Sequence, residues 1–305
     1  MKNLVVSMMA VLVMTQIAAQ NINYTVVKNQ PVEPRISVNL DLFNLDMNSD
    51  IDNLRIDNIS LNVGLFGFVK IAGPLEVDFN VHKSIFTAGK LGYKNYPGNT
   101  ELNGGINFWL TNREKTKNTK VVLASDKSTR NGKEITTTTY ITVPALHQKR
   151  IGIRGGLYSK TGPFNFKDYA GDLNNEGIDQ TKIASYGIYG GFNLRRIINI
   201  VIKDDIYGRS VNSSGRDIYL DAIIVPINRF KDLNNEGENV SELVRGLKTT
   251  SPIGFRLGYK TYQVEKKGFT GKKFGICGIG EFGYKPYQGW FLTAGFGITL
   301  VKQSK

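Results

Sequence analysis

Apolar and polar residues alternate with a period of two through most of this chain. The clearest segment reads LEVDFNVH over residues 75–82. Successive side chains of a β-strand point to opposite faces, so the pattern predicts strands with one apolar and one polar face. Segments such as 183–203 and 289–301 are much longer than the about five or six residues of an ordinary strand. Because strands that cross a membrane need about nine to eleven residues, length and alternation together predict transmembrane strands.

We expect about twelve strands, and ten to fourteen are compatible because 112–125 and 195–203 are weakly patterned. The expected strands lie at 35–45, 58–69, 75–86, 101–111, 118–125, 134–143, 150–159, 183–203, 216–225, 253–263, 273–285 and 289–301. Outer-membrane barrels have short periplasmic turns and longer outer loops. The expected outer connections are 46–57, 87–100, 126–133, 160–182, 226–252 and 286–288. The expected periplasmic ones are 70–74, 112–117, 144–149, 204–215 and 264–272.

The N-terminus has the pattern of an exported protein. Lys2 precedes an apolar run over 4–14, and QIAAQ follows at 16–20. This order is typical of a secretory signal peptide, which we expect to be cleaved after Ala19. The run is too short for a transmembrane helix, and no other stretch approaches about 18 consecutive apolar residues.

These observations predict an all-β fold in the outer membrane. Residues 1–19 are expected to be the signal peptide, 20–34 a periplasmic N-terminal segment, and 35–305 a closed antiparallel transmembrane β-barrel. Closure is expected because lipid cannot satisfy an open sheet edge. A secreted soluble β-sandwich would also alternate, but with shorter strands and more lysine and glutamate on its outward face.

Four stretches carry a resemblance to a known group. They are AAQ at 18–20, SYGIYGGF at 185–192, GFRLGYK at 254–260 and FGYKPYQGWF at 282–291. In these glycine–aromatic strands and this closing hairpin, the chain resembles outer-membrane β-barrel proteins of Bacteroidota. The resemblance implies an outer-membrane location and identifies no subfamily. The chain departs from the group by ending in KQSK rather than in an aromatic residue, so membrane insertion would depend on the internal pattern of the last strand.

Charges of both signs lie on the polar faces of the expected strands. We expect them to line the lumen: Glu76, Asp78, Arg154, Asp217, Asp221, Arg256, Lys260, Glu281 and Lys285. The sequence favours a narrow pore or transport barrel with a mixed-charge lumen, surrounded by outer-membrane lipid. The alternative is a structural or interaction barrel whose outer loops 160–182 and 226–252 bind a protein partner. About eight strands give a filled interior and about sixteen a channel, so both readings stay open.

The hexapeptide DLNNEG occurs at 172–177 and again at 232–237, within these two loops. Its oxygen side chains match the first half of an EF-hand calcium loop. The twelfth position is Ile183 or Leu243, where a bidentate glutamate is required, so turn chemistry is the favoured interpretation. We expect no metal; the candidate ligands would be Asp172, Asn174, Glu176, Asp232, Asn234 and Glu236.

Catalysis has one candidate pair, His82 and Ser84, which share a strand face near the outer rim. Such a pair would suit an outer-membrane lipid hydrolase, which is the third function considered. Ile85 follows where such motifs carry asparagine, and the sequence assigns no orienting carboxylate, so a non-enzymatic barrel is favoured. GICGIG at 275–280 precedes no helix, which excludes dinucleotide binding, and no cofactor is expected. The net charge of +13 is spread along the chain, which argues against nucleic acid.

Overall fold

The computed structural model of the chain describes residues 22–31, 34–49, 56–89, 98–130, 133–164, 181–232, 251–263 and 275–302. These residues form an all-β structure of eleven antiparallel strands. In chain order the strands are β1 (Tyr24–Asn29), β2 (Ile36–Ser49), β3 (Ile56–Ala72), β4 (Leu75–Gly89), β5 (Thr100–Arg130), β6 (Lys133–Phe164), β7 (Thr181–Asp204), β8 (Gly208–Asp232), β9 (Ile253–Tyr262), β10 (Gly275–Lys285) and β11 (Gly289–Lys302). No helix in the described ranges is long and apolar enough to cross a membrane.

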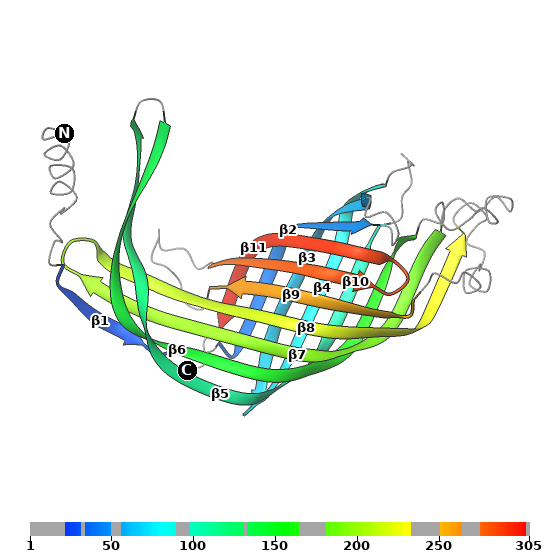
Figure 1. The fold of residues 1–305 in the computed structure, drawn as a ribbon, viewed down its shortest axis with the longest axis horizontal. Helices are drawn as coiled ribbons and strands as arrows, with labels where there is room; N and C mark the ends of the chain where they lie inside the picture. Colours follow the sequence, from blue (N-terminus) through cyan, green and yellow to red (C-terminus); the bar gives the residue numbers. More distant parts are fainter. Residues whose placement is uncertain are drawn as a thin grey trace, which may run out of the picture.

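Strands β2 to β11 form a ring of ten, in which each strand pairs with its neighbours in the chain (Figure 1). The last strand returns to the first: β11 pairs with β2 in a register that runs from Trp290↔Ser49 to Lys302↔Ile36. The expected all-β, antiparallel sheet is therefore confirmed, and its hydrogen bonds close on themselves. The ring is uneven, because β5 to β8 are much longer than β9 and β10.

The structure has eleven strands, ten of them in the ring, which lies within the expected range of ten to fourteen, but two of the expected turns are wrong. Strand β5 continues through the expected turn 112–117, and β6 continues through 144–149. The hairpin register stays continuous there, with Arg113 opposite Lys149 and Thr119 opposite Val143. Both faces of this stretch carry polar residues, so the period-two signal fades although the backbone pairing does not.

The two ends of the ring differ in their connections. At one end, the turn end, residues 73–74 join β3 to β4 and residues 205–207 join β7 to β8. At the other, the loop end, residues 286–288 join β10 to β11. Because the strands alternate in direction, the β5–β6 connection lies at the turn end. The sequence predicts that 126–133 is an outer connection, at the loop end, and that expectation is wrong.

The longest connections, 165–180 and 233–250, join strands at the loop end. They contain the two DLNNEG copies, which lie outside the described residues except for Asp232, the last residue of β8. The candidate ligands Asp172, Asn174, Glu176, Asn234 and Glu236 therefore have no described position.

Strands β5 to β8 project beyond the ring at the turn end, and the β5–β6 hairpin curves away from the other strands (Figure 1). Strand β1, within the expected N-terminal segment 20–34, pairs there with the end of β7, from Tyr24↔Asp204 to Asn29↔Ile200. The projection has its own small core, in which Val121 and Val143 of the hairpin pack with Ile200 and Ile202 of β7.

The two faces of the ring have opposite character. Alternate side chains are buried and polar on one face and exposed and apolar on the other; in LEVDFNVH, for example, Glu76 and Asp78 are buried while Val77 is 37% exposed. Every ring strand contributes to the exposed apolar face, which we call the apolar belt. It includes Leu42, Leu65, Val77, Ile106, Ile153, Phe192, Leu220, Leu257, Phe282, Leu292 and Phe296.

Candidate functional site

The interior of the ring is the candidate site, because it gathers nearly all of the buried charges. The nine charged residues that sequence places in the lumen are all buried, with no more than 8% of any one exposed. Ion pairs join strands that are not neighbours: Arg256 of β9, for example, lies 3.7 Å from Glu101 of β5. These side chains therefore point inward and meet across the ring.

The layer nearest the turn end is built on Arg195 of β7. Its guanidinium donates to both carboxylate oxygens of Glu76, at 2.5 and 2.8 Å, and to both of Asp217, at 2.8 Å each. It also stacks on Phe68, 4.1 Å from the ring centroid, and on Trp109, 4.7 Å away. Two bidentate carboxylate pairs and two aromatic faces enclose this cation, which sequence analysis did not identify because 195–203 is weakly patterned.

A second layer connects two arginines through one shared carboxylate, that of Asp221. Arg154 contacts Asp78 at 2.8 Å and Asp221 at 3.5 Å, while Arg256 contacts Asp221 at 2.8 Å. The Tyr219 ring lies 4.3 Å from the guanidinium of Arg154. These ion pairs compensate buried charges, each of which would be unfavourable without an opposite charge nearby.

A third layer lies near the loop end around Asp46. Its carboxylate contacts Lys285 at 3.2 Å and Lys160 at 3.3 Å, and it accepts a hydrogen bond from Thr293 at 2.9 Å. Lys285 also lies 3.3 Å from Glu101. Asp46, Glu101 and Lys160 were missed from sequence. Asp46 and Lys160 were assigned to outer loops, and Glu101 lies at the end of an expected strand, where facing is hardest to assign.

Inward glycines make room for these large side chains. A Cβ on Gly258 would lie 2.0 Å from Cζ of Tyr219, and one on Gly215 would lie 2.3 Å from the Tyr262 ring. Each glycine therefore accepts an aromatic ring from a neighbouring strand. This explains the glycine–aromatic composition of β9, whose inward positions alternate between glycine and a cation (Gly254, Arg256, Gly258 and Lys260).

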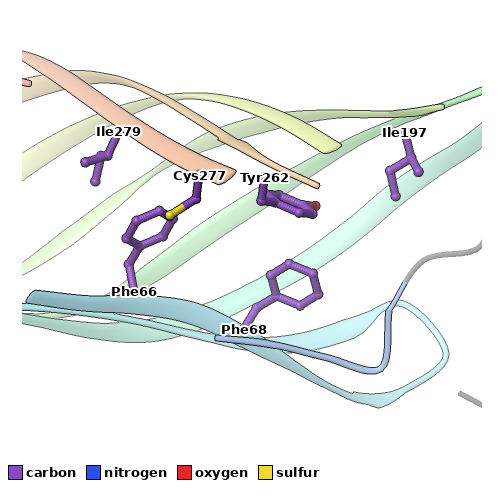
Figure 2. Close-up of a cluster of buried hydrophobic side chains, with 6 residues drawn as sticks. All are labelled: Phe66, Phe68, Ile197, Tyr262, Cys277 and Ile279. Carbon is purple, nitrogen blue, oxygen red and sulfur yellow. The ribbon is translucent and has the colours of Figure 1, made fainter. Parts of the chain in front are cut away.

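Six buried apolar side chains form a cluster in the turn-end half of the interior. They come from four strands: Phe66 and Phe68 of β3, Ile197 of β7, Tyr262 of β9, and Cys277 and Ile279 of β10 (Figure 2). We call this cluster the apolar plug. It lies against the arginine layer, since Phe68 is also the ring on which Arg195 stacks.

Two small cavities lie among the side chains of these layers. A cavity of about 20 Å³ is bordered by Asp78, Arg154 and Lys260, and one of about 10 Å³ by Asp46 and His82. About 10–15 Å³ is needed to hold one water molecule, so both spaces are water-sized. At these two places, the side chains that line the interior leave room for about one water molecule.

The His82–Ser84 pair does not form a catalytic contact. His82 Nε2 lies 3.1 Å from Asp41 Oδ2, while Ser84 Oγ accepts a hydrogen bond of 2.6 Å from the Asn99 backbone N–H. Within the described contacts, neither side chain bonds the other. A serine nucleophile needs its base within hydrogen-bond reach, so this arrangement does not favour a hydrolase.

Among the residues that the structure describes, no group of three or more His, Cys, Asp or Glu side chains is placed to hold a metal ion.

His147 lies in the projecting part of β6, where Thr119 Oγ1 is 2.7 Å from its Nε2. Burial, with the positive charges of Lys117 and Arg196, lowers the pKa of His147 below its usual value. Lys117 and Arg196 therefore place positive charge near this imidazole.

Comparison with known proteins adds no family to this description. The chain matches no protein-family model, and no curated protein matches it. Any functional assignment therefore rests on the residues and their geometry.

Proposed function

We propose that this chain is an outer-membrane β-barrel that is closed by its own side chains and acts as a structural or interaction protein. The observation that carries the proposal is the inverted distribution of polarity. Buried ion pairs fill the interior, while large apolar side chains such as Phe192 and Ile276 are 64% and 69% exposed on the outside. In water this arrangement would be unfavourable, whereas in a bilayer each face meets its preferred surroundings.

The height of the apolar belt fits a bilayer. On β8 its outward row runs from Ile218 to Ile227, with the exposed cations Arg216 and Arg229 just beyond each end. Ten residues at about 3.3 Å each, tilted by about 40°, span roughly 25 Å along the membrane normal. This is the height of the apolar band of transmembrane barrels.

The connections indicate the orientation. Longer outer loops and shorter periplasmic turns characterise these barrels, so the loop end would face outward and the turn end the periplasm. The long connections 165–180 and 233–250, which include most of the loops expected to bind a partner, would then be outside the cell. The projection formed by β1 and β5 to β8 would extend into the periplasm. A protein partner could therefore bind at the loop end or at the projection on the turn end.

Membrane integration is the first test. We expect the protein to fractionate with outer membranes, to resist extraction by alkaline carbonate, and to migrate differently on gels before and after boiling. Continuous hydrogen bonding around the ring should keep it folded in detergent at room temperature. Recovery of the mature protein in the soluble periplasmic or extracellular fraction would contradict the proposal.

A narrow pore is the second candidate, and the water-sized cavities between charged residues are the observation that favours it. Phe66, Phe68 and Tyr262 of the apolar plug border the larger cavity, and apolar constrictions stop ions by excluding water. A pore would therefore require the plug to move.

Planar-bilayer conductance separates the two candidates. We expect the wild type to stay closed and the double variant Phe66→Ala, Phe68→Ala to conduct, because both rings fill the interior at the plug. Phe296→Ala is the matched control, since its ring is 59% exposed on the outward face. Steady conductance of the wild-type protein would favour the pore over the closed barrel.

A further inference from the structure

Four cations stand side by side on the outward face, one on each of four adjacent strands. In the strand register Arg113 of β5 is opposite Lys149 of β6, Lys149 is opposite Arg196 of β7, and Arg196 is opposite Arg216 of β8. All four side chains are exposed. Neighbouring strands are about 4.8 Å apart, so the row is about 14 Å long. We call it the cation row.

The cation row is not neutralised by ion pairs in the described part of the protein. None of its members forms an ion pair with a carboxylate there. Like charges directly opposite one another destabilise a sheet, and this row contains three such contacts in succession. Its positive potential also reaches the neighbouring His147, whose pKa Arg196 helps to lower. An anion bound from outside the chain would relieve this repulsion.

The position of the row indicates where that anion comes from. The next outward row towards the loop end consists of Thr111, Ile151, Leu194 and Ile218. This row forms the turn-end margin of the apolar belt. If the belt lies in hydrocarbon, as the proposed function requires, the cation row lies at the level of the lipid headgroups on the turn-end side. Arginine and lysine at this depth attract anionic lipids.

We propose that the cation row is a binding site for the phosphate of anionic phospholipids in the leaflet at the turn end. The guanidinium group of an arginine can bind two phosphate oxygens at once, and a lysine adds a compact positive charge. The adjacent Ile151 and Ile218 side chains, 37% and 43% exposed, would contact the acyl chains of the same lipid. A dissolved phosphate would gain nothing from this apolar margin, so a lipid fits the surface better than a free anion. The site would hold the ring at a fixed depth and tilt.

The test uses the full chain in phosphatidylcholine liposomes that contain a trace of spin-labelled phosphatidylglycerol or spin-labelled phosphatidylcholine. Electron paramagnetic resonance measures the fraction of each label that the protein immobilises, and hence the ratio of the two association constants. The row variant carries Arg113→Gln, Lys149→Gln, Arg196→Gln and Arg216→Gln. We expect the wild type to prefer phosphatidylglycerol and the row variant to lose about fivefold or more of that preference.

A control variant removes the same charge elsewhere on the turn-end side. It carries Lys120→Gln, Lys127→Gln, Lys133→Gln and Lys203→Gln, all at exposed positions beyond the belt. The control should keep the wild-type preference, whereas equal losses in both variants would reduce the effect to overall charge and overturn the site. The half variant Arg113→Gln, Arg216→Gln serves if the full row variant does not fold, and it too should lose preference.

Two further measurements are needed. The first distinguishes a lipid phosphate from free phosphate as the ligand, and the second distinguishes failure of the cation row from failure of the proposed function. Inorganic phosphate at matched ionic strength should displace the lipid no better than chloride does; specific displacement would overturn the lipid as the ligand. Sedimentation with the liposomes is measured first, because a chain that does not insert contradicts the proposed function on which this inference rests. Insertion without any headgroup preference overturns the cation row alone.

Discussion

Replacing Arg195 with alanine should destabilise the folded protein by about 3–5 kcal/mol, because removing one partner leaves buried charge uncompensated. Glu76 and Asp217 each lose two hydrogen bonds to the guanidinium, and both carboxylates stay in the interior. Phe68 and Trp109 lose the cation that stacks on them. Urea unfolding in detergent micelles, followed by tryptophan fluorescence and by the gel shift, measures the change.

Arg196→Ala is the matched control, with the same residue type one position along β7 and on the opposite, exposed face. Its effect on the free energy of unfolding should stay within about 0.5 kcal/mol, as for other exposed sites. If the two alanine variants unfold at the same urea concentration, the interior ion pairs contribute little and the layered core described above is wrong.

The sequence predicted facing better than it predicted boundaries. In LEVDFNVH the assignment of Glu76 and Asp78 to one face and Val77 to the other follows from geometry alone, because strand side chains must alternate. All-β class and antiparallel pairing follow from the same signal. Around Arg113 and Lys117 both faces of the strand are polar, so alternation carries no information there. The sequence pattern therefore predicted two strands in place of the continuous strand β5.

The interior contacts could be predicted only in part. Mixed charges on the polar face indicated ion pairs, but their partners depend on which strands face each other across the ring. Asp46, for instance, meets Lys160 and Lys285 from β6 and β10, which lie far from it in sequence. No local pattern contains that information. The apolar plug was missed for a related reason, since Phe66 and Phe68 occupy positions that the rest of β3 gives to polar residues.

Leu292→Arg should cost up to about 2–4 kcal/mol when the protein is unfolded from phospholipid bilayers, since this is the cost of arginine at the midplane of transmembrane barrels and it falls towards the interfaces. Leu292 is 45% exposed on β11, between Phe282 of β10 and Met47 of β2 in the register. In water an exposed leucine can be replaced by arginine at little cost, so the size of the effect reports which solvent surrounds the ring.

Ile135→Arg supplies the comparison, because Ile135 is similarly exposed, at 41%, but lies on the projecting part of β6 beyond the belt. Its replacement should change the free energy of unfolding by no more than about 0.5 kcal/mol in the same liposomes. The difference between the two variants should shrink in detergent, where micelles deform around a charge more readily than a bilayer does. Equally small costs at both positions in bilayers would mean that the apolar belt is not in contact with lipid, and the membrane assignment would have to be abandoned.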